Sequence, residues 1–381
     1  MGVLFVVASI FSVFYYWDPT RTFIKRWQEP DPYIFEAIDP TLFAYDPVTS
    51  LSVHGDDDIH RVRHQLISIV WGEEGIPFHR MPNKTRLSIQ SDPGITAGCH
   101  DVEIPHTRRR LHCEVHGYAH WSNLAGVDDL TVSIDNEYTS SIGYFRPQDP
   151  NGVLVLYQHG YAGTYHDQHR IIERLISDGY TVAALNHVSY GDNRCPDGRP
   201  EYCYVGWGTF QVPLPMRLHF TPPVVAINYA LSQGHVRGIA MIGLSAGAWV
   251  TAVTAAVDTR VDISFPIAGV MPKPLVRGNE WPKAERYEPL INAASFPDLY
   301  VLASDSPKRR QTQIFNQYDR CCYSGLRPLL FADSLKTFIG HLTGGVFNVV
   351  IDESHPRHKI SRRALAVIAD ELRLLSEDPK N

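Results

Sequence analysis

The chain has 381 residues, of which 44% are hydrophobic and 20% are charged, and its formal net charge at pH 7 is −6. This length is enough to bury one large core or two smaller ones. The acidic balance offers no basic surface for a nucleic acid, so nucleic-acid binding is not expected, and we find no internal repeat or low-complexity tract. The composition is that of a globular chain of enzyme size with an additional segment at its front.

That segment, residues 1–17, reads MGVLFVVASIFSVFYYW and carries no charge. It is at the lower length limit for a membrane-spanning helix. Arg21, Lys25 and Arg26 follow it, whereas a signal peptide carries its basic residues in front. We expect a membrane anchor or a signal segment, with membrane association through residues 3–17. A secreted chain is the alternative localisation, and a helix packed on the domain is the third interpretation.

Residues 18–127 are predicted to form an N-terminal extension, because most of this stretch is rich in Pro, Asp, His and Arg and shows no sustained periodicity. We expect it to wrap around the main domain or to supply one wall of a site. The cysteines are even in number and form no C-x-x-C, which disfavours a zinc ribbon and leaves disulfides open for an exported chain. They are Cys99, Cys113, Cys195, Cys203, Cys321 and Cys322.

From residue 128 to 381, strands and helices are predicted to alternate, which indicates a mostly parallel central sheet with helices on both faces, an α/β architecture. Apolar runs typical of strands come at 130–135, 140–147, 152–160, 180–188, 238–244, 262–269, 298–304 and 347–354. Helical spacing or Ala-rich composition comes at 166–179, 221–234, 246–257 and 361–375.

One strand-to-helix junction carries a nucleophile motif. Gly243-Leu244-Ser245-Ala246-Gly247 stands between the buried run 238–244 and an Ala-rich helix. A sharp bend there holds the serine in a strained conformation with its hydroxyl outward, and the two glycines let strand and helix approach without a clash. Parallel sheets form their sites at the carboxyl ends of strands, where Ser245 and the His159-Gly160 pair both lie.

Through these motifs, the region from about residue 140 to 375 resembles the α/β-hydrolase superfamily, in its esterase- and lipase-like branch. The resemblance rests on YQHGYAGT after one strand, GLSAG after a later one, and a histidine loop after the last strand. It implies the α/β-hydrolase fold, a Ser245 nucleophile, and an acid and a histidine that follow it in that chain order.

The resemblance places the base in the loop IDESHPRHKIS and the acid near the predicted strand 298–304. His358 is preferred as the base because it stands at the loop-to-helix junction, and His355 is the alternative. Asp305 directly follows the predicted strand. Asp319 is preferred as the acid, because its aromatic and cysteine-rich surroundings indicate burial, and a buried carboxylate needs a partner such as an imidazole N–H.

An oxyanion hole needs two backbone N–H groups, and the resemblance assigns them to Tyr161 and Ala246. His159 is predicted to order its loop. The H-x-x-H pairs, at His166 and His169 and again at His355 and His358, have a spacing that metal sites use but lack the frame of a known site, so no metal and no other cofactor is expected. Insertions near 191–219 and 270–297 are predicted to form a lid or pocket wall.

The prediction is therefore a serine hydrolase that cleaves a carboxylic ester or thioester through an acyl-enzyme on Ser245. Its expected substrate is a small-molecule or lipid-like ester. A peptidase or amidase with the same triad is the alternative enzyme class, since the nucleophile motif does not determine which type of bond is cleaved. A non-catalytic, membrane-tethered binding module of the same fold is the alternative from another class.

Overall fold

The computed structural model describes residues 17–29, 33–88, 118, 121–135, 138–161, 163–188, 190–193, 214–277 and 284–377. The predicted anchor or signal segment thus lies outside the described residues, apart from Trp17. Most of the predicted insertion at 191–219 lies outside them as well. None of the helices in the described parts of the chain is both long and apolar enough to cross a bilayer.

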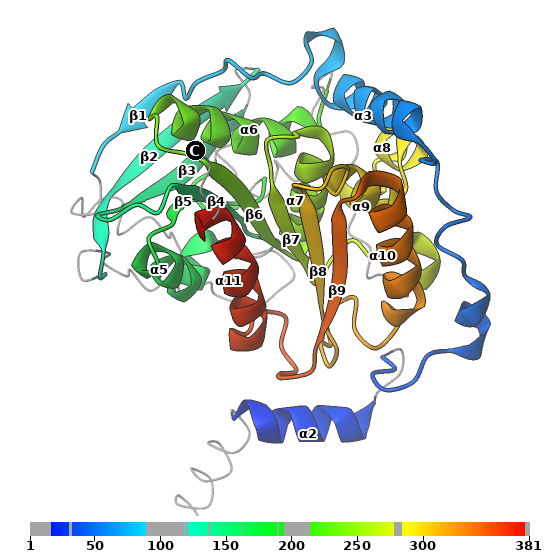
Figure 1. Ribbon diagram of the computed structural model, residues 1–381. Helices are drawn as coiled ribbons and strands as arrows, with labels where there is room; N and C mark the ends of the chain where they lie inside the picture. The colour runs from blue at the N-terminus through cyan, green and yellow to red at the C-terminus, as the bar shows by residue number, and fades with distance from the viewer. Residues whose placement is uncertain are drawn as a thin grey trace, which may run out of the picture.

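One nine-stranded sheet forms the centre of the molecule, in the order β1-β2-β3-β5-β4-β6-β7-β8-β9 (Figure 1). Strands β1 to β3 pair antiparallel at one edge, and β3 pairs antiparallel with β5. The six strands from β5 to β9 in that order pair parallel, which confirms the mostly parallel sheet. The strands are β1 (Lys84–Arg86), β2 (Leu124–Ile134), β3 (Tyr138–Pro147), β4 (Val153–Gln158), β5 (Thr181–Leu185), β6 (Gly238–Leu244), β7 (Ile263–Ile267), β8 (Arg310–Asn316) and β9 (Val346–Asp352).

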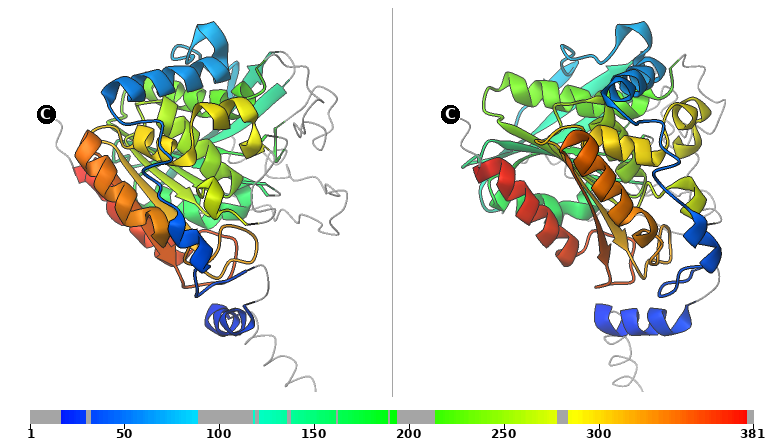
Figure 2. Two further views of the ribbon diagram at one scale, coloured as in Figure 1. Left: turned by 90° about the vertical axis from the view of Figure 1, so that its right-hand side faces the viewer. Right: turned by 45° about the vertical axis from the view of Figure 1, so that its right-hand side comes forward.

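Helices cover both faces of the sheet (Figures 1 and 2). The central strands explain why, because their alternating side chains are apolar in both directions. Leu154 and Leu156 of β4 join the core under α6, α7, α9 and α10, whereas Val155 and Tyr157 join the core under α5 and α11. The helices are α2 (Asp18–Gln28), α3 (Asp56–Trp71), α5 (His169–Ser177), α6 (Arg217–Ser232), α7 (Ala246–Val257), α8 (Glu288–Ala293), α9 (Phe296–Ala303), α10 (Leu329–Thr343) and α11 (Arg362–Glu377), with short 3-10 turns at Pro40–Ala44, Gly72–Glu74, Tyr165–Gln168, Lys273–Leu275 and Ala284–Arg286.

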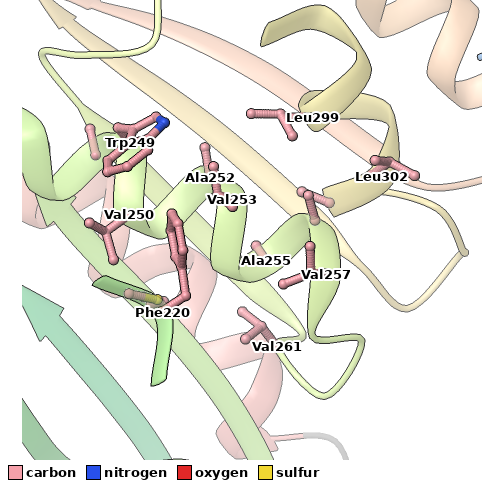
Figure 3. Packing of buried hydrophobic residues seen from close by; sticks show 14 of the residues in the cluster. Phe220, Trp249, Val250, Ala252, Val253, Ala255, Val257, Val261, Leu299 and Leu302 are labelled. Carbon is pink, nitrogen blue, oxygen red and sulfur yellow. The ribbon is translucent and has the colours of Figure 1, made fainter. Parts of the chain in front are cut away.

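Helix α7 is buried along its whole length, which its small residues permit. Trp249 packs edge-to-face on Phe220 of α6, with ring centroids 5.1 Å apart. Leu299 and Leu302 of α9 belong to the same core, and Figure 3 shows them beside α7. A helix buried on all sides has no freedom to shift, so the residue at its start, Ser245, has a fixed position.

The predicted strand at 298–304 is wrong, because this stretch is helix α9. Ser295 caps the helix in a capping box with Asp298, and Pro297 occupies its first turn. The prediction failed since every residue of α9 is buried. A short helix without a polar face shows no 3.6-residue period and cannot be told from a buried strand.

The strand that follows α9 was missed by the sequence analysis. Strand β8 reads RQTQIFN and looks like a polar loop, yet all but its first residue are buried. Its glutamines bond to each other and to the neighbouring strand: Gln313 donates to Gln311, which donates to Ser264 of β7. These hydrogen bonds offset part of the desolvation cost of burying polar side chains in this strand.

The N-terminal extension packs on the sheet domain through α3. Arg63 of α3 is buried, and its guanidinium donates to the carbonyl of Ala256 at the end of α7 and to the Asp305 carboxylate. Helix α2 lies at the end of the sheet where β9 leads into the following loop (Figure 1). The extension also supplies β1, which pairs with β2 at the edge of the sheet, so it contacts the sheet domain at several places.

Candidate active site

Ser245 has the backbone conformation of a nucleophile elbow. Its φ of 59° and ψ of −124° are unusual for a residue with a side chain. Its N–H donates to the carbonyl of Ile267 at 2.8 Å, and its carbonyl accepts from Ala248 at 2.8 Å. Strand β7 and the first turn of α7 therefore hold the strained residue from both sides.

The two glycines of the motif are required by close contacts. A Cβ on Gly243 would lie 2.1 Å from the carbonyl oxygen of Gly247, and a Cβ on Gly247 would lie 2.2 Å from that of Gln158. Any side chain at either position would separate α7 from β4 and β6. The spacing of Gly243, Ser245 and Gly247 is thus a packing requirement of the bend.

The loop after β4 lies directly against the nucleophile. A Cβ on Gly160 would lie 2.8 Å from the Cβ of Ser245 and 3.3 Å from the backbone nitrogen of Ala246. Tyr161 comes next in the chain. The two backbone N–H groups assigned to the oxyanion hole, those of Tyr161 and Ala246, are thus carried by segments in contact with each other. Their role stays a prediction.

Asp319 and His358 form a short hydrogen bond. The loop after β8 carries Asp319, and the loop between β9 and α11 carries His358. The Nδ1 of His358 lies 2.6 Å from Oδ2 of Asp319, whose side chain is 1% exposed. A carboxylate only accepts, so Nδ1 carries the proton and Nε2 keeps its lone pair. This Nε2 is buried and has no hydrogen-bond partner among the described residues.

His358 also lies close to the loop after β4, which packs against Ser245. Burial is the main cause that lowers the pKa of His159 to about 3, and the proximity of His358 and His187 contributes to this shift. His159 precedes Gly160, the residue packed against Ser245. Both the serine and the histidine therefore border the loop after β4. Hydrogen bonds between such groups are often long before substrate binds.

The two alternatives from the sequence lie elsewhere. Asp305 precedes β8 and so stands at the opposite end of the sheet, where it forms ion pairs with Arg63 at 2.6 Å and with Arg309 at 2.7 Å. His355 is 1% exposed, accepts from the N–H of Arg357, and lies 3.5 Å from Asp352. The structure brings Asp319 to His358 and gives Asp305 and His355 other partners.

An aromatic wall that the sequence analysis did not predict adjoins the oxyanion segment. The Tyr161 ring lies 4.4 Å from that of His187, which lies 4.9 Å from that of His219. His219 in turn meets Trp249 of α7 edge-to-face at 5.2 Å. Burial lowers the pKa of His187 to about 4 and that of His219 well below its usual value, so both rings are neutral at pH 7. The position of His187 after strand β5 was the one available signal.

The N-terminal helix is attached to the histidine loop. Asp18 of α2 forms ion pairs with Arg357 at 3.0 Å and with Lys359 at 2.9 Å, the two neighbours of His358. Further along, Gln28 accepts a hydrogen bond from Arg320, which follows Asp319. No pattern in the sequence indicated these contacts, since they join residues more than 280 positions apart.

One cluster within the described part of the chain has the residue types of a metal site. The sulfur atoms of Cys321 and Cys322 and a ring nitrogen of His358 lie within 4.8 Å of one another. The histidines of the HDQH stretch have other partners: His166 contacts Tyr118 and Asp192, and His169 contacts the carbonyl of His166.

No family model matches the sequence, and no curated protein matches it either. Solved structures do match. Acetyl xylan esterase 1 from Thermoanaerobacterium sp. is 11% identical, with a TM-score of 0.52 over 90% of this chain and 99% of its own. An acetyl xylan esterase from Paenibacillus sp. R4 is 14% identical, with a TM-score of 0.50 over 89% and 99%. The methylesterase BT1017 is 13% identical, with a TM-score of 0.56 over 87% and 66%.

These likenesses extend over most of the chain. At such low sequence identities these matches indicate the fold alone, and the chemistry has to be argued from the residues of this chain. The chain has the fold of the α/β-hydrolase superfamily, as its motifs predict.

Proposed function

We propose that the protein hydrolyses carboxylic esters through an acyl-enzyme on Ser245, with His358 as base and Asp319 as its partner. One observation carries the proposal: Asp319 binds the Nδ1 of a histidine whose buried Nε2 has no partner among the described residues. A neutral imidazole held in this tautomer is ready to accept a hydroxyl proton. The strained serine on the neighbouring elbow supplies that hydroxyl.

The reaction follows from these positions. Nε2 of His358 takes the proton as Ser245 Oγ attacks the ester carbonyl, and the Tyr161 and Ala246 N–H groups stabilise the oxyanion. The same nitrogen then protonates the departing alkoxide. A water molecule, deprotonated by Nε2, cleaves the acyl-enzyme and restores the serine. The buried Asp319 carboxylate stabilises the imidazolium formed in each half of the cycle.

An ester is favoured over an amide because the three structural neighbours described above are named as esterases. Two of them act on acetyl groups by name. Short acyl esters such as p-nitrophenyl acetate are therefore the first substrates to assay, followed by longer acyl chains. A peptide amide of the same acyl group tests the alternative enzyme class.

The decisive experiment is labelling with a fluorophosphonate, which reacts only with an activated serine. We expect the native chain to be labelled and Ser245→Ala to take no label. Ser232→Ala is the matched control, because Ser232 is an exposed residue at the end of α6 and lies outside both the elbow and the loop of His358, and it should label like the native chain. Equal labelling of native chain and Ser245→Ala, or none of a folded native chain, would refute the proposal.

We further propose that α2 holds the chain at a lipid surface. Trp17, Phe23 and Trp27 are 57%, 69% and 82% exposed, and Phe23 and Trp27 share one face at i, i+4 spacing. Lys25 and Arg26 supply positive charge for anionic headgroups. Sedimentation with vesicles of phosphatidylcholine and phosphatidylserine should decrease for Phe23→Ser/Trp27→Ser and stay unchanged for Phe43→Ser, which alters another exposed aromatic residue. Equal sedimentation of all three chains would exclude a role for α2.

A further inference from the structure

Two adjacent cysteines stand beside the proposed catalytic base without a part in the hydrolysis. Cys321 and Cys322 are joined by a disulfide. Their sulfur atoms and a ring nitrogen of His358 lie within 4.8 Å of one another. Cys321 is exposed and Cys322 is half-buried. Three strong ligand atoms for a soft metal ion are thus gathered at a position that solvent can reach.

The chain on either side of the cysteines is held firmly. The N–H of Cys321 donates to Oδ1 of Asp319 at 2.8 Å, and Oδ2 of that carboxylate binds His358. On the other side, Tyr323 is buried and its hydroxyl donates to Glu285 at 3.0 Å. Because these bonds do not involve sulfur, cleavage of the disulfide leaves both thiols next to the imidazole.

The geometry suits an ion with tetrahedral preference. Zinc binds thiolate sulfur at about 2.3 Å and imidazole nitrogen at about 2.0 Å, so its ligand atoms stand about 3.5–3.8 Å apart. The ring nitrogen of His358 would have to approach the sulfur atoms by at most about 1 Å, whereas the two sulfur atoms, now bonded to each other, would move apart after reduction. Zinc sites with three protein ligands leave the fourth position for water. The neutral imidazole and two thiols, once deprotonated, provide one such set.

We propose that Cys321 and Cys322, when reduced, form with His358 a binding site for one thiophilic divalent cation of the zinc type, and that this ion inhibits the enzyme. A phosphine reductant supplies the two electrons and becomes the phosphine oxide with the oxygen of a water molecule, whose two protons convert the cleaved disulfide into two thiols. Both protons leave when the ion binds. The ion then occupies His358, which no longer takes the proton of Ser245. The disulfide form has no thiolate and does not bind the ion.

The inhibitory half of this inference rests on the proposed function, whereas the metal site does not. Binding is therefore measured first and without substrate. The full chain is reduced with a phosphine, freed of it under argon, and titrated with Zn²⁺ against a chromophoric chelator. Co²⁺ is used in parallel, because thiolate ligands give it an intense charge-transfer absorption. The variants are Cys321→Ser/Cys322→Ser and, as a matched control, Cys195→Ser/Cys203→Ser.

We expect the reduced native chain and the control to bind one more Zn²⁺ per chain than Cys321→Ser/Cys322→Ser. His358→Ala should weaken the binding at least tenfold. Equal stoichiometry in the reduced native chain and the Cys321→Ser/Cys322→Ser variant, or in the reduced and oxidised native chain, would overturn the site. Fluorophosphonate labelling of the Cys321→Ser/Cys322→Ser variant without metal shows that it is folded, and single Cys322→Ser replaces it if labelling is lost.

Inhibition is measured as the rate of fluorophosphonate labelling at Ser245. One equivalent of Zn²⁺ should slow labelling of the reduced native chain at least tenfold, and a chelator should restore it. The oxidised chain should not respond. Zinc bound with unchanged labelling would overturn the inhibitory half alone. Absence of labelling in the metal-free oxidised chain would instead refute the proposed function, while the zinc stoichiometry would still test the site.

Discussion

Replacing Asp319 with asparagine tests the proposed triad at its most buried member. The native carboxylate is 1% exposed and lies 2.6 Å from Nδ1 of His358, so it fixes the proton on Nδ1. An amide nitrogen at the same place would donate to Nδ1 and leave the proton on Nε2, where it blocks transfer from Ser245. The same substitution in other serine triads lowers kcat by about 10⁴. We expect a loss of about 10³ to 10⁴, or about 4 to 5.5 kcal/mol.

Asp305→Asn is the matched control, since the sequence alone left Asp305 and Asp319 as rival acids. Asp305 has buried ion pairs with Arg63 and Arg309. Loss of its charge should destabilise the fold by about 3 kcal/mol or more, because two buried guanidinium groups would lose their counter-charge. Turnover per folded molecule should stay within a few-fold of native, since Asp305 stands at the far end of the sheet.

The assay is hydrolysis of p-nitrophenyl acetate, with the folded fraction counted from urea unfolding curves. A thousandfold lower kcat for Asp305→Asn together with near-native kcat for Asp319→Asn would refute the triad assignment. Equal, small effects of both would show that His358 acts without a carboxylate.

The remaining predictions concern shape and pH. Gly160→Ala should lower kcat at least tenfold and destabilise the fold by about 1–3 kcal/mol, because its methyl group would lie 2.6 Å from the Leu244 carbonyl oxygen and 2.8 Å from the Cβ of Ser245; native kcat would contradict the contact. Burial lowers the pKa of His187 to about 4 from 6.5, so between these pH values the unfolded chain protonates this imidazole and the folded chain does not. Urea unfolding should therefore show the full free energy of unfolding above pH 6.5 and a value lower by up to about 3 kcal/mol at pH 4. Burial raises the pKa of Glu285 to about 8 from 4.5, so its stabilisation is full below pH 4.5 and decreases as pH rises. Glu285→Gln, which keeps an acceptor for Tyr323, should therefore stabilise the chain at pH 7.5 by up to about 4 kcal/mol; equal native and variant stability at pH 7.5 would exclude this shift.

The elbow was predictable because its motif is short and lies between two long apolar runs. A Cβ on Gly243 would meet the carbonyl oxygen of Gly247, four residues further on, whereas a Cβ on Gly247 would meet that of Gln158 in β4. The same holds for β4 and β6, whose residues are buried on both faces and so form continuous apolar runs. Where local contacts and burial agree, the sequence pattern is unambiguous.

Prediction failed where burial removed the pattern. Helix α9 is buried on all sides and resembled a strand, while β8 buries glutamines and resembled a loop. The two errors together moved the apparent strand end to Asp305. The acid at the true strand end, Asp319, was still preferred, because its aromatic and cysteine-rich surroundings indicated a buried carboxylate. That argument depended on desolvation, which does not require the correct strand.

The contacts of the N-terminal extension lie beyond any local pattern, and they bear on the reactivity of His358. The turn that carries this histidine is held from inside, since Ser354 and Ser361 both donate to Asp352. From outside it is held by Asp18, which pairs with the residues on both sides of His358. Two neighbouring cations repel each other unless they share a counter-ion, so α2 stabilises the turn in its present form. A lipid surface or partner that moves α2 would therefore remove the counter-ion from both neighbours of the proposed base, His358.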